Sequence, residues 1–302
     1  MLAQRTPAHL WLDAMRRADF AAAWAVSDAV LAARDPATCD DPARPYHERW
    51  VWDGTPVDGR RVLVRCYHGL GDTLQFARYL APLRARAAHV MLEVQADLLA
   101  LLRHVPGPDA LHPFDPARPL PPAACTLEIM ELAHVLRLAP DSAPYLLVAA
   151  TPGPPGRVGL CWQAGGWSPA RSLDVAALAP LADLPGLRLV SLQRGPAAAH
   201  ANRLGAADPL EGSMDLPAVA RLVAGLDVVV TVDTMVAHLA GALGRPTLLM
   251  LKHDPDWRWQ AARPVWYASM RRFVQPRPGA WSPVVERVVQ HLIETFSVAK
   301  GS

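Results

Sequence analysis

The sequence predicts an α/β protein with two doubly wound parallel sheets, preceded by a short helical extension. Strand and helix signals alternate in two separate stretches of the 302 residues, at 61–104 and again at 157–296. The second stretch contains continuous Val/Leu runs, such as 227–232, which are typical of strands buried on both faces. A Pro/Gly-rich segment at 151–156 separates the two stretches and is the best linker candidate.

Composition excludes several classes of protein. Hydrophobic residues make up 51% of the chain and the net charge is +2, so we expect neither general disorder nor a nucleic-acid-binding surface. No run of about 18 apolar residues occurs, which predicts no membrane span but leaves peripheral membrane contact open. The start of the chain lacks the pattern of a secretory signal. The widely spaced cysteines favour buried, reduced thiols in a cytoplasmic protein over a metal site: Cys39, Cys66, Cys125 and Cys161.

The first third of the chain predicts a helical extension followed by a first Rossmann-like domain. Residues 8–33 have helical spacing and resemble one tetratricopeptide unit, so 1–35 is either a docking extension or the remnant of a longer array. Residues 36–60 are rich in turn signals, and 105–125 are rich in proline and give no clear element. In the domain at 36–152 we expect a strand, a helix, a strand and a helix in that order, at 61–66, 72–86, 89–94 and 96–104.

The strand–helix pattern starts again after the linker and predicts a second Rossmann-like domain at 153–282. A last amphipathic helix follows it. The expected strands are 157–162, 187–193, 227–232 and 246–251, and the expected helices are 174–181, 216–224, 234–243 and 283–296.

The first motif follows the strand at 61–66 and contains His68, Gly69, Gly71 and Asp72. The two glycines permit a tight turn, although the further glycine of a dinucleotide-binding loop is missing. Asp72 either caps the next helix or projects from it as a general base. His68 beside it is a candidate for a second acid–base group or an acceptor contact.

The second motif covers 231–246, where a buried strand leads directly into a helix. The amides of the first helical turn are a ready site for a diphosphate. Thr234 could add a hydroxyl donor, Asp233 could accept from a ribose or sugar hydroxyl, and His238 lies one turn further on the same helix face. The alternative is a capped helix with a core histidine.

Two further stretches combine loop and charge. After the strand at 157–162, a glycine loop leads to Arg171 and Ser172, where the arginine could neutralise a leaving diphosphate or simply be solvated. Gln193 ends another strand on the same sheet edge and could reach a base or ribose. The aromatic loop at 256–267 could stack a nucleobase or sugar, but packing onto the core is the favoured interpretation.

Together, these motifs resemble the heptosyltransferase-like glycosyltransferases, particularly the bacterial branch associated with tetratricopeptide repeats. The similarity covers roughly 50–296 and rests on 69–80, 232–246 and the aromatic loop. It implies a GT-B fold, in which an acceptor-side domain at 36–152 and a nucleotide-sugar-binding domain at 153–282 face a cleft. It also implies that the last helix, 283–302, crosses back to pack on the first domain.

The resemblance further implies inverting transfer of a sugar without a metal or other cofactor. The substrate would be a nucleotide-diphosphate sugar, with ADP-heptose favoured, and the acceptor a hydroxyl of a lipopolysaccharide core, another glycan or a protein. Asp72 takes the place of the catalytic base and Arg171 that of a phosphate contact. The donor-binding turn would contain Asp233, Thr234, Met235 and His238.

Two departures from the family pattern support a rival hypothesis. Tyr67-His68 stands where the branch usually has Glu-Gln, and the N-terminal domain is compact. The alternative function is therefore a catalytically inactive, GT-B-like binding or scaffold module.

Overall fold

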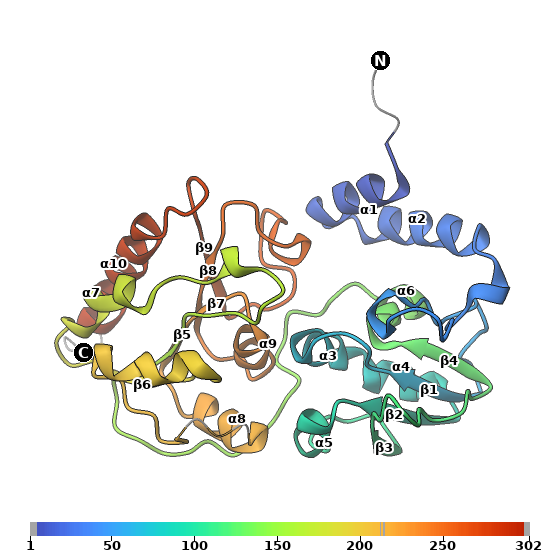
Figure 1. Ribbon diagram of the computed structural model, residues 1–302, viewed down its shortest axis with the longest axis horizontal. Coiled ribbons are helices and arrows are strands. Elements are labelled where there is room, and N and C mark those ends of the chain that lie inside the picture. Colours follow the sequence, from blue (N-terminus) through green and yellow to red (C-terminus); the bar gives the residue numbers. More distant parts are fainter. Residues whose placement is uncertain (1–4, 212, 214, 299–302) are drawn as a thin grey trace. The chain divides into compact units, whose positions relative to one another are not determined.

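The computed structural model describes residues 5–211, 213 and 215–298 and forms two compact units (Figure 1). Unit 1 contains the residues up to Ser142 together with Trp257–Trp266, and unit 2 contains Ala143–Asp256 and the residues from Tyr267 onward. Among the described residues, no helix combines the length and apolar character that a bilayer crossing requires.

A four-stranded parallel sheet forms the centre of unit 1, with the strand order β3-β2-β1-β4. Arg65 is in register with both Glu93 and Glu128, so these residues lie level with one another on three adjacent strands. The two short outer strands, β3 and β4, lie in or at the end of the proline-rich stretch in which no clear element was expected. The strands are β1 (Arg61–Arg65), β2 (His89–Val94), β3 (Ala110–Pro113) and β4 (Cys125–Glu128).

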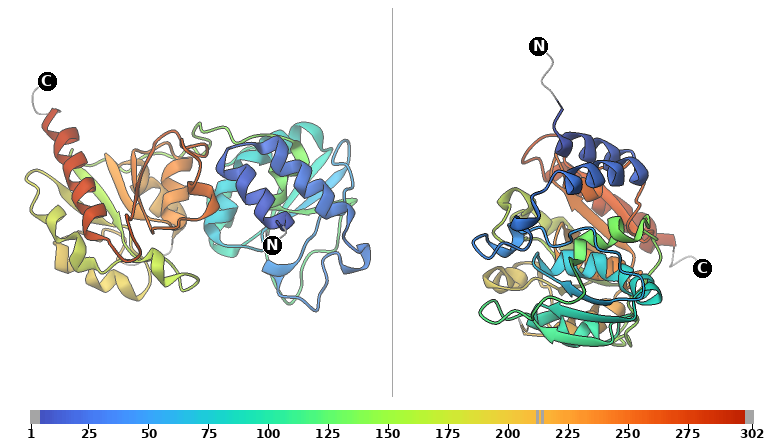
Figure 2. Two further views of the ribbon diagram at one scale, coloured as in Figure 1. Left: turned by 90° about the horizontal axis from the view of Figure 1, so that it is seen from above. Right: turned by 90° about the vertical axis from the view of Figure 1, so that its right-hand side faces the viewer.

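The helices of unit 1 follow the sequence prediction with one interruption. The two helices expected within 8–33 are present and pack side by side (Figures 1 and 2). The single helix expected at 72–86 is divided by a 3₁₀ turn at Ala77–Tyr79, because Pro82 lacks the N–H that would bond to residue 78 and its ring crowds that carbonyl. The helices are α1 (Pro7–Arg16), α2 (Phe20–Ala32), α3 (Leu70–Phe76), α4 (Leu80–Arg86), α5 (Ala96–Leu102) and α6 (Leu132–Leu136).

Unit 2 contains a five-stranded parallel sheet with the order β6-β5-β7-β8-β9. Strand β9 and a long 3₁₀ helix, Pro196–Leu204, were not expected from the sequence. The helix expected at 174–181 is a 3₁₀ turn, Val175–Leu178, followed by one α-helical turn. The elements are β5 (Arg157–Cys161), β6 (Arg188–Ser191), β7 (Val228–Val232), β8 (Thr247–Leu251), β9 (Met270–Val274), α7 (Ala179–Ala182), α8 (Leu216–Ala224), α9 (Met235–Ala242) and α10 (Ser282–Val298).

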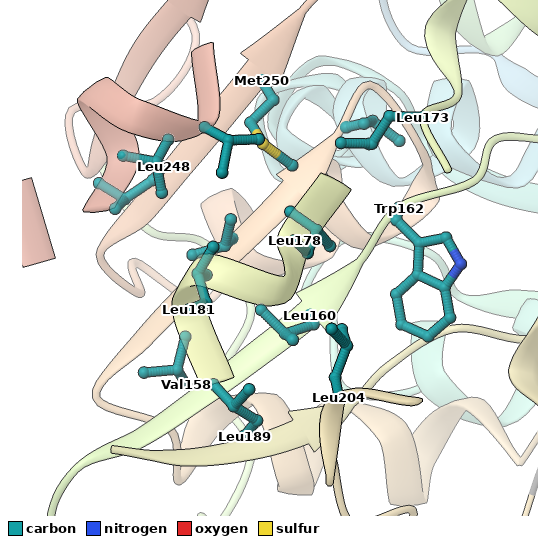
Figure 3. Packing of buried hydrophobic residues seen from close by; sticks show 14 of the residues in the cluster. Val158, Leu160, Trp162, Leu173, Leu178, Leu181, Leu189, Leu204, Leu248 and Met250 are labelled. Atoms are coloured by element: carbon teal, nitrogen blue, oxygen red, sulfur yellow. The ribbon is translucent and has the colours of Figure 1, made fainter. Parts of the chain in front are cut away.

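Side chains from the sheet of unit 2 and from the helices on one of its faces form a continuous apolar core. Leu160 and Met250 of the sheet, Leu178 and the indole of Trp162 are among the side chains that Figure 3 shows. Most members of this cluster are almost completely buried, and Trp162 is 0% exposed. The continuous apolar strands are therefore covered on this face, as their composition predicts.

The prediction that the last helix crosses to the first domain is wrong. Val284, Val285, Val288 and Leu292 of α10 are at most 2% exposed and belong to the core of unit 2. Figure 2 shows α10 beside the strands of that unit. Its wide apolar face is thus used on its own sheet, while residues 299–302 of the predicted segment lie outside the described residues.

The division of the chain also differs from the predicted boundary at 152/153. Tyr145 and Leu146 donate backbone hydrogen bonds to Ala242 at 3.0 and 3.1 Å, and Thr151 donates one to Arg221 at 2.8 Å. The Pro/Gly segment therefore lies within unit 2. The segment Trp257–Trp266 between β8 and β9, in contrast, belongs to unit 1.

Candidate functional site

In unit 1, the loop after β1 places Asp72 at the start of α3. Its Oδ2 accepts a hydrogen bond from the Gly69 N–H at 3.0 Å, so the capping role considered from the sequence is present. Its Oδ1 accepts from the guanidinium of Arg258, and the Asp72 side chain remains 26% exposed. Asp72 is therefore a fixed carboxylate that solvent and ligands can still reach.

The two glycines of this loop do not use a left-handed backbone. Gly69 has a φ of −72°, and Gly71 lies in the first turn of α3. A Cβ atom at Gly69 would come within 3.1 Å of Asp72 Oδ2. Close approach of the carboxylate, rather than backbone freedom, favours glycine at position 69.

His68 lies beside this carboxylate and is oriented by a buried acid. Its Nδ1 is 3.2 Å from Oε1 of Glu128, and its side chain is 30% exposed. Burial by itself lowers the pKa of His68, but the hydrogen bond and charge of Glu128, with a contribution from Asp72, outweigh it and raise the pKa. His68 is thus biased towards the imidazolium form, with Glu128 as its partner.

Sequence reasoning missed a row of buried charges at this sheet edge. Arg65, Glu93 and Glu128 are 1–3% exposed and lie at or one residue before the ends of three neighbouring strands. Arg65 forms an ion pair with Glu93, and its Nη2 donates to the Leu120 carbonyl at 2.9 Å. A charged residue at or next to the end of each of these apolar strands was the signal that could have revealed this row.

In unit 2, the turn from β7 into α9 gathers three of the predicted donor-binding residues. Asp233 is 7% exposed. Thr234 is the N-cap of α9, and its Oγ1 accepts from the Val236 N–H at 3.2 Å. Met235 is the first helical residue and is partly exposed. The turn therefore has the capped helix start that the sequence predicts.

Arg171 lies against this turn. Its Nη1 donates to the Asp233 carbonyl at 3.2 Å and is 3.9 Å from the carboxylate Oδ2 of the same residue. The side chain is 23% exposed, so part of the guanidinium can meet a ligand. The neighbouring Ser172 closes the loop, since its Oγ accepts from the Ala164 N–H at 3.0 Å.

Gln193 and His238 are held by the protein itself. Gln193 is 5% exposed, and its Oε1 accepts from the backbone N–H groups of Trp162 and Gln163 at 3.0 and 2.8 Å. His238 is 5% exposed, with its Nδ1 3.0 Å from the Tyr267 hydroxyl. The contacts of His238 match the alternative of a core histidine. Those of Gln193 show that its side chain stabilises the loop after β5.

Metal-binding residues are not clustered among the described residues, where no group of three or more His, Cys, Asp or Glu side chains could hold a metal ion. All four cysteines are free, and burial raises the pKa of the Cys66 and Cys161 thiols.

Known proteins resemble this chain both in sequence and in fold. The family model for glycosyltransferase family 9 (heptosyltransferase) matches residues 197–274. Protein FlbA of Caulobacter vibrioides is 27% identical over 292 residues, covering 80% of this chain and 48% of FlbA. The chain thus spans about half the length of the curated relative it matches.

Solved structures show the same fold at low sequence identity. A family 9 glycosyl transferase from Veillonella parvula is 13% identical, with a TM-score of 0.59, covering 80% of this chain and 98% of that one. The ADP-heptose lipopolysaccharide heptosyltransferase II of E. coli is 15% identical, with a TM-score of 0.55, covering 80% and 100%. These structures confirm the GT-B fold class. The resemblance to heptosyltransferase-like glycosyltransferases is confirmed by the family model that matches 197–274. The matched family is one of glycosyltransferases, which is the enzyme class that the sequence predicts.

Proposed function

We propose that this chain is an inverting glycosyltransferase that transfers heptose from ADP-heptose to a hydroxyl of a glycan, lipopolysaccharide core or protein. The observation that carries the proposal is the polar turn of unit 2, where Arg171 contacts Asp233 beside the N-cap Thr234. A guanidinium and a helix start together suit a diphosphate. The match to glycosyltransferase family 9 includes the turn itself but not Arg171.

The reaction needs one displacement. Asp72 takes the proton of the acceptor hydroxyl, whose oxygen bonds to the anomeric carbon while the bond from that carbon to the diphosphate oxygen breaks. Arg171 and the amides at the start of α9 would stabilise the charge on the departing nucleoside diphosphate. Attack from the face opposite the diphosphate inverts the configuration, and no enzyme nucleophile or metal ion takes part.

In this scheme His68 contributes a positive charge and does not act as the primary base. Its raised pKa and its contact with Glu128 favour an imidazolium beside Asp72, which suits a contact to an anionic or hydroxyl-rich acceptor. Peripheral contact with a membrane surface would follow only from a lipopolysaccharide acceptor.

Calorimetric titration tests the proposal without knowledge of the acceptor. The panel contains ADP, UDP, GDP, ADP-heptose, UDP-glucose and GDP-mannose. We expect ADP and ADP-heptose to bind more tightly than the others. A preference for UDP or GDP ligands would overturn the donor assignment. Absence of binding by every ligand at millimolar concentration would favour the inactive scaffold.

A further inference from the structure

A single arginine from a distant part of the chain joins two residues of α3. Arg258 lies in the segment Trp257–Trp266, which belongs to unit 1. Its Nη2 donates to Asp72 Oδ1, and its Nε donates to Gln75 Oε1 at 2.6 Å. Residues three positions apart lie on one helix face. The guanidinium therefore spans the first turn of α3, on the side where the Asp72 carboxylate projects.

Aromatic packing fixes the position of this guanidinium. The Arg258 side chain is 10% exposed, and its guanidinium carbon lies 4.4 Å from the ring centre of Trp257. The Trp257 ring centre is 5.0 Å from that of Trp11 in α1 and 5.8 Å from that of Trp266. Both neighbours restrict the indole on which Arg258 rests.

The far end of the segment is attached to the same helix. The ring centre of Trp266 lies 5.6 Å from that of Phe76, the last residue of α3, and the Trp266 carbonyl accepts from Arg78 Nη1 at 2.7 Å. The segment thus contacts α3 near both ends of the helix. Arg258 has little freedom to leave Asp72 while these contacts persist.

Both carboxylate oxygens of Asp72 accept a hydrogen bond from the protein, but each can accept a further one. Gly69 donates to Oδ2 and Arg258 to Oδ1. An ionised carboxylate offers about four lone-pair sites, so each oxygen keeps a direction in which it can accept a proton. The two donors fix the plane of the carboxylate, and its 26% exposure leaves the remaining directions open to an acceptor.

We propose that Arg258 is a positioning residue, which holds the carboxylate of Asp72 in the orientation needed to take the acceptor proton. This inference rests on the proposed function, in which Asp72 is the base. The rival explanation is that Arg258 is only a strap, that is, a residue that attaches the segment to α3 and has no effect on the orientation of Asp72. Loss of such a residue changes stability alone, whereas loss of a positioning residue changes turnover of the folded protein.

Arg49 provides a matched control within unit 1. Its side chain is 9% exposed, it forms an ion pair with Asp40 at 3.3 Å, and its guanidinium carbon lies 4.0 Å from the ring centre of Tyr46. Burial, charge partner and aromatic contact therefore match those of Arg258. Within the described residues, the Arg49 guanidinium bonds to Asp40 and to the carbonyls of Arg44 and Pro42, and not to Asp72 or α3.

The experiment compares Arg258→Gln, Arg258→Lys, Arg49→Gln and Asp72→Asn with the wild type. ADP-heptose, UDP-glucose and GDP-mannose are each supplied with lipopolysaccharide core oligosaccharide, and release of the nucleoside diphosphate is followed for the fastest donor. Thermal unfolding is recorded for every variant. We expect Arg258→Gln to lower kcat roughly 10- to 100-fold, with the donor KM within about twofold of wild type. Arg258→Lys should recover part of the loss, and Arg49→Gln should keep wild-type kcat at a similar loss of stability.

The outcomes separate this inference from the function on which it rests. If Asp72→Asn is inactive while Arg258→Gln retains wild-type kcat, Arg258 is only a strap and the proposed function stands. If Asp72→Asn retains wild-type turnover, the proposed function of Asp72 as the base fails and the inference fails with it.

Discussion

The carboxyl edges of the two sheets are built from different polar groups. In unit 1, the edge carries buried charges on three adjacent strands, with Arg65 between Glu93 and Glu128. In unit 2, the buried side chains at the ends of β6 and β7 are mainly uncharged, as with Ser191 and Thr231. The charges at the edge of unit 1 thus pair with one another. The edge of unit 2 instead has a partly exposed arginine beside a capped helix start.

This difference suits the two tasks of the proposed reaction. A base must be held in one ionisation state and one orientation, which internal ion pairs and hydrogen bonds achieve. A donor site must accept a diphosphate that brings its own negative charge, so an arginine and helix amides are more useful there than carboxylates. Each edge can be tested by changing one group that distinguishes it from the other.

Removal of the charge from Asp72 is expected to have the largest effect. Asp72→Asn keeps an oxygen that can accept from the Gly69 N–H, so the helix cap persists while the base is lost. We expect a rate loss of roughly 10²–10⁴, the usual range for a general base. Calorimetry should show nearly unchanged affinity for the donor.

The matched control for this variant is Asp19→Asn, which alters another helix cap of the same unit. Asp19 Oδ1 accepts from the Ala22 N–H at 3.1 Å at the start of α2. Its turnover should equal that of the wild type. Equal turnover of Asp72→Asn and wild type would reduce Asp72 to a helix cap and remove the contrast between the two edges.

Loss of Arg171 is the corresponding test in unit 2. Arg171→Gln removes the positive charge beside Asp233, and we expect kcat/KM to fall roughly 10- to 100-fold because the departing diphosphate loses one stabilising group. Arg188→Gln is the control, since Arg188 starts β6 at the opposite end of the sheet and its Nη1 donates to the Pro155 carbonyl. Equal kinetic losses in the two variants would indicate a general effect of charge.

Local patterns predicted the parts of the fold and site that depend on neighbours in sequence. The buried strands, the helix starts at Asp72 and Thr234, and the loop carrying Arg171 follow from runs of apolar residues and turn residues. The partners of these residues depend on tertiary contacts, and Arg258 is separated from Asp72 by 186 positions. No local signal specifies such a pair.

The error at α10 has the same physical origin. The valines at 284, 285 and 288 indicate an apolar helix face, but they do not indicate which sheet covers it. In the structure, the core of unit 2 covers this helix face. Likewise, the aromatic residues at 257–266 predicted packing but could not show that the packing is on α3.

A smaller effect is expected from Glu131, which lies next to the charged edge of unit 1. Loss of solvation raises the pKa of Glu131 from 4.5 to about 7, and the nearby charge of Glu128 adds to the rise. The folded protein therefore binds this proton more tightly than the unfolded chain. Its free energy of unfolding falls as the pH rises from about 4.5 to about 7.

Glu131→Gln should remove this loss of stability. One oxygen at the Oε2 position can still accept from the Glu128 and Trp52 N–H groups, which lie 2.8 and 3.1 Å from Oε2. We expect the free energy of unfolding of the variant to exceed that of the wild type by about 1–2 kcal/mol at pH 8 and by little at pH 5. Urea unfolding at both pH values measures the difference, with the more exposed Glu48→Gln as control. A constant difference would show that this carboxyl does not titrate between them.

The smallest expected effect is at Thr234, the N-cap that distinguishes the helix start in unit 2. Thr234→Val keeps the shape of the side chain but removes the Oγ1 that accepts from the Val236 N–H, and should lower the free energy of unfolding by about 1 kcal/mol. Thr234→Ser retains the acceptor and should restore most of this stability. If Thr234 also donates to the diphosphate, ADP affinity measured by calorimetry should fall with Val and recover with Ser. Unchanged ADP affinity in Thr234→Val, together with the stability loss, would limit Thr234 to capping and leave Arg171 as the main contact of this edge with the donor phosphates.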